Sequence, residues 1–248
     1  MAEPNAGTRA SLRLLAGSKH GAALPYLLLT LTFVTGLVDA VSVLELGRVF
    51  VANMTGNVVS IGFAIAGAPG FSLWGSALAL AGFVAGATIG GGIVARVSVP
   101  RRTMLRNVLL IVVLFFIAST VIAWTTDDAA GPLAQNAIVV LTSFALGLQN
   151  AAVRHLAVPD LTTTVLTMTI TGIAADIRSG DRIAVTRRAF AIVSMLLGAT
   201  AGGFIVLHLG VTVALAVIVV VQLVVAAFLA FLPPDPGVPA AEGSRTAG

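Results

Sequence analysis

The chain has 248 residues, of which 58% are hydrophobic and 10% are charged. Soluble domains carry about 25% charged residues, so this composition excludes an ordinary soluble enzyme or binding domain and predicts an all-α, polytopic membrane protein. The isoelectric point near 11.0 does not indicate a nucleic-acid partner, because the net charge is only +4 and the basic residues lie between apolar runs. Cysteine is absent, which excludes disulfides and thiol chemistry.

In chain order, residues 1–22 are expected to form a cytoplasmic N-terminal segment that contains three basic residues. An uncleaved first helix follows, because its apolar run is about 20 residues long, enough to cross a bilayer. Residues 23–126 are predicted to form a first membrane repeat and residues 132–232 a second one. The proline- and glycine-rich residues 233–248 are predicted to be a disordered C-terminal tail.

An internal repeat is indicated by three pairs of similar blocks that occur in the same order. In the third pair, seven of nine residues are identical. Each half then contains one long helix, one short segment and two more long helices. The pairs are "FVTGLVDA" (33–40) with "FALGLQNA" (144–151), "MTGNVV" (54–59) with "LTTTVL" (161–166), and "GATIGGGIV" (86–94) with "GATAGGFIV" (198–206).

The short segments, 54–67 and 162–175, would rise only about 21 Å as helices, against a hydrocarbon core of about 30 Å. If both re-enter and leave on the side from which they came, 13 of the 14 Lys and Arg residues are cytoplasmic and only Arg48 is outside. If both cross, the split is 8 to 6. Positive charge concentrates in cytoplasmic loops. We therefore expect six transmembrane helices plus two re-entrant helices in two inverted repeats, with both termini cytoplasmic.

The stretch "VFVANMTGNVV" (49–59) places several polar residues between two apolar runs. Asn53 or Thr55 is suited to cap the first turn of the short helix, and Gly56 would allow close approach of another chain or a ligand. In the second half, Asp160 or Thr162 can cap the corresponding helix. The predicted substrate-binding or coupling residues are Asp39, Asn53, Thr55, Gly56, Asn57, Asn150, Asp160, Thr162 and Thr163.

Asp39 is expected to face the protein interior, because a carboxylate that faces lipid at the membrane centre costs about 2.5–3.5 kcal/mol. Two roles are open for this residue. It can couple protons to transport or contact the solute, or it can bind the "NMTGN" backbone and hold the loop in place. Asn150 aligns with Asp39 and keeps the polarity without the charge.

Glycines recur every four residues at Gly82, Gly86 and Gly90, and again at Gly198 and Gly202. Such spacing lets membrane helices approach closely, either between the two halves or between subunits of a homo-oligomer. The three histidines are far apart in the sequence and do not form a metal-binding pattern. No nucleophile elbow, phosphate loop or zinc motif appears, so we expect no metal, no cofactor and no enzymatic activity.

The chain resembles the YoaK-like (DUF1275) family of bacterial inner-membrane proteins. The resemblance rests on "TGLVDAVSVLELGRVFVANMTGNVVSIG" (35–62) and extends over about 22–232. It implies location in the bacterial inner membrane, and it implies no reaction, because the family is built on a domain of unknown function.

Paired interrupted segments within inverted repeats are typical of transport sites. The leading hypothesis is therefore a transporter or channel for a small polar or anionic solute, bound between the two short helices near the midplane. The alternative is a non-transporting membrane scaffold or lipid-binding protein. In either case the lipid bilayer is the expected surrounding.

Overall fold

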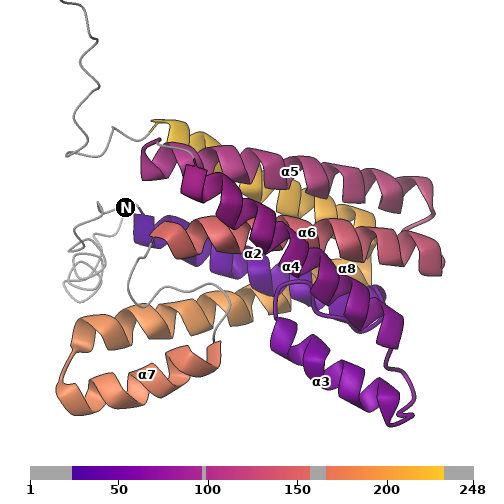
Figure 1. The fold of residues 1–248 in the computed structure, drawn as a ribbon, viewed down its shortest axis with the longest axis horizontal. Helices are drawn as coiled ribbons and strands as arrows, with labels where there is room; N and C mark the ends of the chain where they lie inside the picture. The colour runs from indigo at the N-terminus through magenta and orange to yellow at the C-terminus, as the bar shows by residue number, and fades with distance from the viewer. Residues whose placement is uncertain (1–23, 97–98, 157–165, 232–248) are drawn as a thin grey trace, which may run out of the picture.

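The computed structural model describes residues 24–96, 99–156 and 166–231, and these ranges form seven helices and no strands (Figure 1). The all-α prediction is confirmed for this part of the chain. The predicted segments 1–22 and 233–248 lie outside the described residues. The helices are α2 (Leu24–Glu45), α3 (Met54–Ile65), α4 (Leu73–Arg96), α5 (Arg101–Thr125), α6 (Pro132–Leu156), α7 (Leu166–Ser179) and α8 (Arg182–Phe231).

Five of these helices, α2, α4, α5, α6 and α8, are long and apolar enough to cross a membrane. Their outer surfaces expose large apolar side chains, such as Leu114 on α5 and Phe204 on α8. A surface of this kind suits hydrocarbon better than water, and helices satisfy their own backbone hydrogen bonds there. The core lies among the same helices and contains fully buried side chains that include Leu31, Leu105, Phe116, Ile138, Leu146, Leu215 and Ile218.

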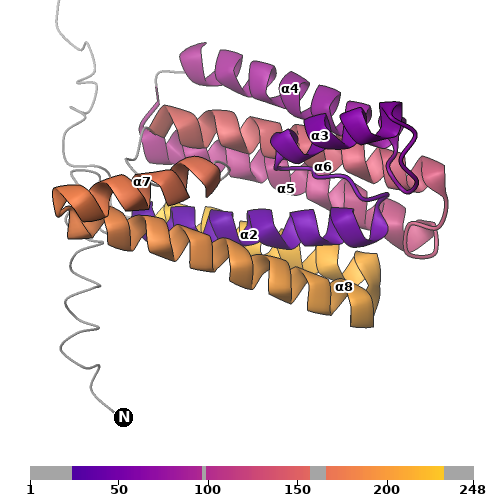
Figure 2. The same ribbon diagram turned by 90° about the horizontal axis from the view of Figure 1, so that it is seen from below.

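α8 is 50 residues long and is interrupted at Gly210, where φ is 85° and ψ is 174°. In both views the chain reverses direction after this point, so that the yellow part of α8 runs back alongside the bundle (Figures 1 and 2). The Asp128 carboxylate accepts hydrogen bonds from the backbone N–H groups of Val211 (3.0 Å) and Thr212 (2.7 Å). A Cβ on Gly210 would lie 1.8 Å from Asp128 Oδ2. Asp128 therefore caps the second part of α8, and the break requires glycine.

α2 packs on α8 through a close glycine contact. A Cβ on Gly198 would lie 2.0 Å from the carbonyl oxygen of Phe33, and a Cβ on Gly36 would lie 2.2 Å from the carbonyl oxygen of Met195. Real Cβ atoms do not approach backbone oxygens this closely. The two helices therefore approach along their backbones, as small residues permit in membrane helices.

α4 packs on α6 in a matching way. A Cβ on Gly86 would lie 2.0 Å from the carbonyl oxygen of Phe144, and a Cβ on Gly147 would lie 2.2 Å from the carbonyl oxygen of Phe83. In the aligned sequence blocks, Gly86 corresponds to Gly198 of α8. Gly147 corresponds to Gly36 of α2, and Phe144 corresponds to Phe33 of α2. Equivalent residues therefore form both helix crossings.

The glycine stripe of α4 is occupied within the chain. Gly82, Gly86 and Gly90 are buried, and a Cβ on each would lie 3.0 Å or less from an atom of α6. Packing between the two halves, one of the two predicted uses, is therefore what the structure shows. These glycines do not provide a surface for a second copy of the chain, and that expectation is corrected.

The two short helices differ from their predicted bounds of 54–67 and 162–175. α3 ends at Ile65, because Gly67 has a φ of +81° and the backbone N–H of Ala68 donates to the carbonyl of Phe63 (3.0 Å). Residues 162–165 lie outside the described residues, and α7, described from Leu166, continues past the predicted end to Ser179, since the first left-handed glycine after it is Gly180 (φ +79°). α3 packs on α4, and α7 packs on α8.

Both short helices start partway along the bundle and run outward to opposite ends of it. In both views their N-terminal ends point toward one another (Figures 1 and 2). α3 ends at the same end of the bundle as α2, and α4 starts there (Figure 1).

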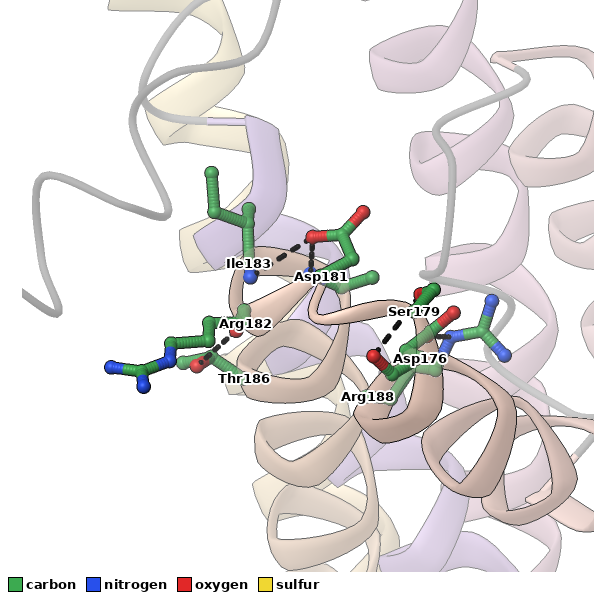
Figure 3. Close-up of polar contacts among 8 residues, drawn as sticks. Asp176, Ser179, Asp181, Arg182, Ile183, Thr186 and Arg188 are labelled. Atoms are coloured by element: carbon green, nitrogen blue, oxygen red, sulfur yellow. Dashed lines mark hydrogen bonds and ion pairs between the residues drawn. The ribbon is translucent and has the colours of Figure 1, made fainter.

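The turn between α7 and α8 is fixed by short-range polar contacts (Figure 3). The Asp181 carboxylate accepts hydrogen bonds from the backbone N–H groups of Ile183 (3.1 Å) and Ala184 (3.0 Å), and so caps α8. Arg188 Nε forms an ion pair with Asp176 Oδ2 at 3.0 Å, which joins α8 to α7. This turn determines the direction in which α7 extends.

Candidate functional site

Asp39 lies in the interior of α2 with 5% of its surface exposed. Its Oδ1 accepts hydrogen bonds from the backbone N–H groups of Val51 (3.0 Å) and Ala52 (2.9 Å). Its Oδ2 accepts a hydrogen bond from the side-chain amide of Asn53. Of the two roles predicted for Asp39, these hydrogen bonds fit the second, holding of the loop. They bind the backbone of Val51 and Ala52, just before the "NMTGN" stretch named in the prediction, and the side chain of Asn53.

Asn57 completes this arrangement from α3, and it is fully buried. Its Oδ1 accepts a hydrogen bond from the backbone N–H of Phe50 (2.9 Å), and its Nδ2 donates to the carbonyl of the same residue (2.5 Å). Together, Asp39 and Asn57 bind the backbone N–H groups of three successive residues that are not in a helix. Irregular backbone at membrane depth requires such partners.

Gly56 is required by the same local packing. A Cβ at this position would lie 2.4 Å from Cδ2 of the Phe50 ring. The close approach predicted at Gly56 is therefore made by a ring of the same chain. The segment before α3 is held from both sides, by the ring against Gly56 and by the two polar side chains.

The start of α3 has no side-chain cap. Asn53 occupies the N-cap position, but its side chain makes no capping hydrogen bond and donates instead to Asp39. Thr55 is exposed in the first turn. The predicted cap from Asn53 or Thr55 is therefore wrong, because the buried carboxylate competes for the Asn53 amide. No side-chain oxygen accepts a hydrogen bond from the first-turn N–H groups of α3, which carry the positive end of the helix dipole.

In the second half, the structure describes only part of the predicted site. Asn150 is half-buried on α6, and its amide donates to the carbonyl of Leu146 (2.9 Å). Asp160, Thr162 and Thr163 lie outside the described residues. Within the described ranges, no group of three His, Cys, Asp or Glu residues could hold a metal ion.

Two polar residues that the sequence analysis did not single out are fully buried. Gln222 Nε2, in the second part of α8, donates a hydrogen bond to Gln149 Oε1 on α6 at 2.8 Å. The sequence does carry a signal for Gln222, which interrupts the apolar run "VALAVIVVVQLVVAAFLAF" (213–231). A polar residue inside such a run is expected to face the protein interior.

The helical fold, the five apolar spans and the polar side chains that face inward from them define the class of this molecule: it is a multi-pass helical membrane protein. The model of the family described as protein of unknown function (DUF1275) matches residues 27–228. The chain belongs to this family, and the resemblance drawn from the sequence is confirmed.

A curated relative is the UPF0700 transmembrane protein YoaK of Bacillus subtilis (strain 168), which is 32% identical over 154 residues. That alignment covers 61% of this chain and 66% of the relative, so the chain spans just under two thirds of the relative's length. No solved structure matches the chain.

Proposed function

We propose that this protein is a transporter or channel of the bacterial inner membrane that passes a small polar or anionic solute between the N-terminal ends of α3 and α7. The observation that carries the proposal is that two short helices start partway along the bundle with these ends directed toward one another (Figures 1 and 2). Opposed half-helices of this kind form solute sites in known transporter folds.

The proposed topology has six crossings, formed by α2, α4, α5, α6 and the two parts of α8 on either side of Gly210. α3 and α7 re-enter from opposite sides and do not cross. Both termini are then cytoplasmic, with 13 of the 14 Lys and Arg residues on that side. The reversal of α8 supports the sixth crossing.

In this topology the two halves are inverted repeats. Each half crosses the membrane three times, which is an odd number, so the second half starts from the opposite side of the membrane. The matched glycine contacts support the repeat, since Gly198 against Phe33 and Gly86 against Phe144 occupy aligned positions with the same 2.0 Å approach. The outward direction of α3 and α7 toward opposite ends of the bundle supports the inversion.

The chemistry of the site favours negative charge or strong dipoles on the solute. Each helix N-terminus carries roughly half a positive charge, and the first turn of α3 receives no side-chain cap. Thr55, exposed in that turn, supplies a hydroxyl at the same place. Cations are disfavoured for the same electrostatic reason.

Asp39 positions this site through the segment that precedes α3. It also provides a route for proton coupling, because protonation turns one acceptor oxygen of the carboxylate into an O–H donor. Protonation would therefore release one of its contacts to Val51, Ala52 or Asn53. Loosening of this segment would change the position of the α3 N-terminus.

Flux into proteoliposomes tests the proposal, with chloride, formate, phosphate, glycerol and urea as probes and protein-free liposomes as the blank. We expect Thr55→Asp to suppress anion entry and Thr55→Ser to retain it. An acidic residue in a first helical turn stabilises the helix, so loss of flux in the first variant would not reflect unfolding. Asp39→Asn and Asn53→Ala should also reduce flux. If no probe enters faster than in the blank, the scaffold or lipid-binding alternative stands and transport is refuted.

The topology is tested separately by labelling with a membrane-impermeant thiol reagent, because the chain has no native cysteine. Single cysteines at Ala66, Val99 and Ala130 should be labelled outside, inside and outside, respectively. If α3 and α7 cross, the same positions report the reverse order for a cytoplasmic N-terminus. That result would remove the opposed helix ends on which the proposal depends.

A further inference from the structure

Gln149 and Gln222 form a polar pair in the middle of the apolar core. Both side chains are fully buried, and one hydrogen bond of 2.8 Å joins them. Gln222 lies near the centre of the second part of α8, and its neighbours Val221 and Leu223 are apolar. α8 packs chiefly on α2 and α5, so this pair joins α6 to α8 where helix packing contributes little.

The hydrogen-bonding capacity of the pair is only partly used. Gln149 Nε2 and Gln222 Oε1 are each buried and have no hydrogen-bond partner. Exchanging the oxygen and nitrogen atoms of both amides does not change this, because one N–H donor and one carbonyl acceptor again remain. The pair therefore has one unused donor and one unused acceptor, on two side chains that a hydrogen bond joins.

We propose that the Gln149–Gln222 pair binds one water molecule inside the membrane-spanning core. The water accepts a hydrogen bond from Gln149 Nε2 and donates one to Gln222 Oε1, which satisfies both unused groups. Buried polar groups without partners are costly, and buried waters in proteins bind at sites with two to four polar partners, typically about three. The flanking side chains on both helices, including Leu148, Ala152 and Val225, are apolar and buried.

This water site is independent of the proposed transport function, since neither glutamine contacts α3 or the Asp39 network in the hydrogen bonds described above. Its consequence is structural and local: α6 and the second part of α8 are joined by a hydrated polar link. The experiments below measure hydration and stability, so they can fail without bearing on solute flux, and flux can fail without bearing on them.

The first experiment uses the small number of glutamines. The chain has three, at 135, 149 and 222, so selective ¹⁵N-glutamine labelling yields three side-chain amide signals from the full chain in lipid nanodiscs. Gln222→Leu and Gln149→Leu assign the two buried signals. In water-edited spectra we expect magnetisation transfer from water to the Gln149 amide as well as to Gln135, which is partly exposed at the start of α6. Transfer to Gln135 alone would overturn the proposal, because the pair would then be dry.

The second experiment tests the pair as a unit by thermal unfolding. Each single variant leaves one buried amide without its partner, so we expect the Tm of Gln149→Leu and of Gln222→Leu to fall by several degrees. The double variant removes all the unsatisfied groups together and should unfold at or above the Tm of either single variant. If the two decreases simply add in the double variant, the pair is not a coupled site and the proposal fails.

Discussion

Replacing Asp39 by asparagine changes one buried hydrogen-bonding centre and little else, because the two side chains have nearly the same shape. The asparagine oxygen can still accept the N–H groups of Val51 and Ala52. Its amide nitrogen, however, then faces the side-chain amide of Asn53, which donates to Asp39 Oδ2 in the native protein. With the Asn53 amide in its native orientation, two donors face each other and the third contact is lost.

The magnitude follows from these three contacts. A hydrogen bond to a charged group contributes about 1.5–3 kcal/mol, and a neutral one about 0.5–1.5 kcal/mol. Losing the Asn53 contact and converting the other two to neutral bonds would cost roughly 3.5–6 kcal/mol on that scale. Removing a buried charge offsets part of this cost. We therefore expect Asp39→Asn to lower the free energy of unfolding by about 2–3 kcal/mol.

Unfolding in mixed micelles, followed by far-UV circular dichroism as the fraction of SDS is raised, measures this change. Asp127→Asn provides a matched control, because Asp127 is exposed in the α5–α6 loop. A rescue variant is also available: Asn53→Asp in the Asp39→Asn background restores one donor opposite one acceptor. The restored carboxylate would lie at the N-cap of α3, where negative charge is favourable, so about half of the lost stability should return.

This role of Asp39 would be refuted if Asp39→Asn unfolded within about 0.5 kcal/mol of the wild type, the range typical of surface substitutions. It would also be refuted if the rescue variant were less stable than Asp39→Asn alone. Either result would mean that the hydrogen bonds of Asp39 do not hold the segment before α3 in the micelle-embedded protein.

Further predictions concern packing and capping. Gly86→Ala should destabilise the protein by about 1–3 kcal/mol, because its Cβ would lie 2.0 Å from the Phe144 carbonyl oxygen. Gly91→Ala is the control and should not destabilise it, because a Cβ there meets nothing within 4 Å. Equal unfolding curves for the two variants would contradict the close contact between α4 and α6. Burial alone would raise the pKa of Asp128, but hydrogen bonds from Thr212 and Val211 outweigh it and hold that pKa below its ordinary value. Asp128 then contributes stability above the unfolded-state pKa, near 3.9, and the contribution is lost as the pH falls through the lower folded pKa. Asparagine has only one acceptor oxygen for the N–H groups of Val211 and Thr212, so Asp128→Asn should lose one hydrogen bond, about 0.5–1.5 kcal/mol at pH 7. Its difference from the wild type in unfolding measurements should shrink below about pH 4; a difference that is constant with pH would contradict the cap.

The helical class and the approximate spans could be predicted because length and hydropathy determine which segments can cross a bilayer. The polar stretch before α3 could be located for the same reason, since polar residues between apolar runs require partners. The hydrogen-bond assignments within it could not be predicted. Asn53 has the side chain of a good cap, and only the buried carboxylate of Asp39, 14 residues earlier in the sequence, explains why its amide is used elsewhere.

The repeat predicts two long helices at the end of the second half, but it does not locate the break between them at Gly210. Its cap, Asp128, is 83 residues from Val211 in the sequence, so no local pattern could reveal it. The same holds for the contact between Gln149 and Gln222, which are 73 residues apart. Local composition identifies which residues are unusual for their surroundings, whereas partners this far apart in the sequence are determined by the packing of helices.

The glycine crossings also have a consequence for biogenesis. α2 packs closely on α8, which starts at Arg182. α4 packs closely on α6, which starts at Pro132 and is therefore synthesised earlier. During synthesis, α2 must therefore remain in the bilayer with its glycine face open to lipid until most of the chain has been inserted. A chain truncated before α8 would contain one complete crossing and one incomplete crossing, and quality-control proteases would encounter it in that form.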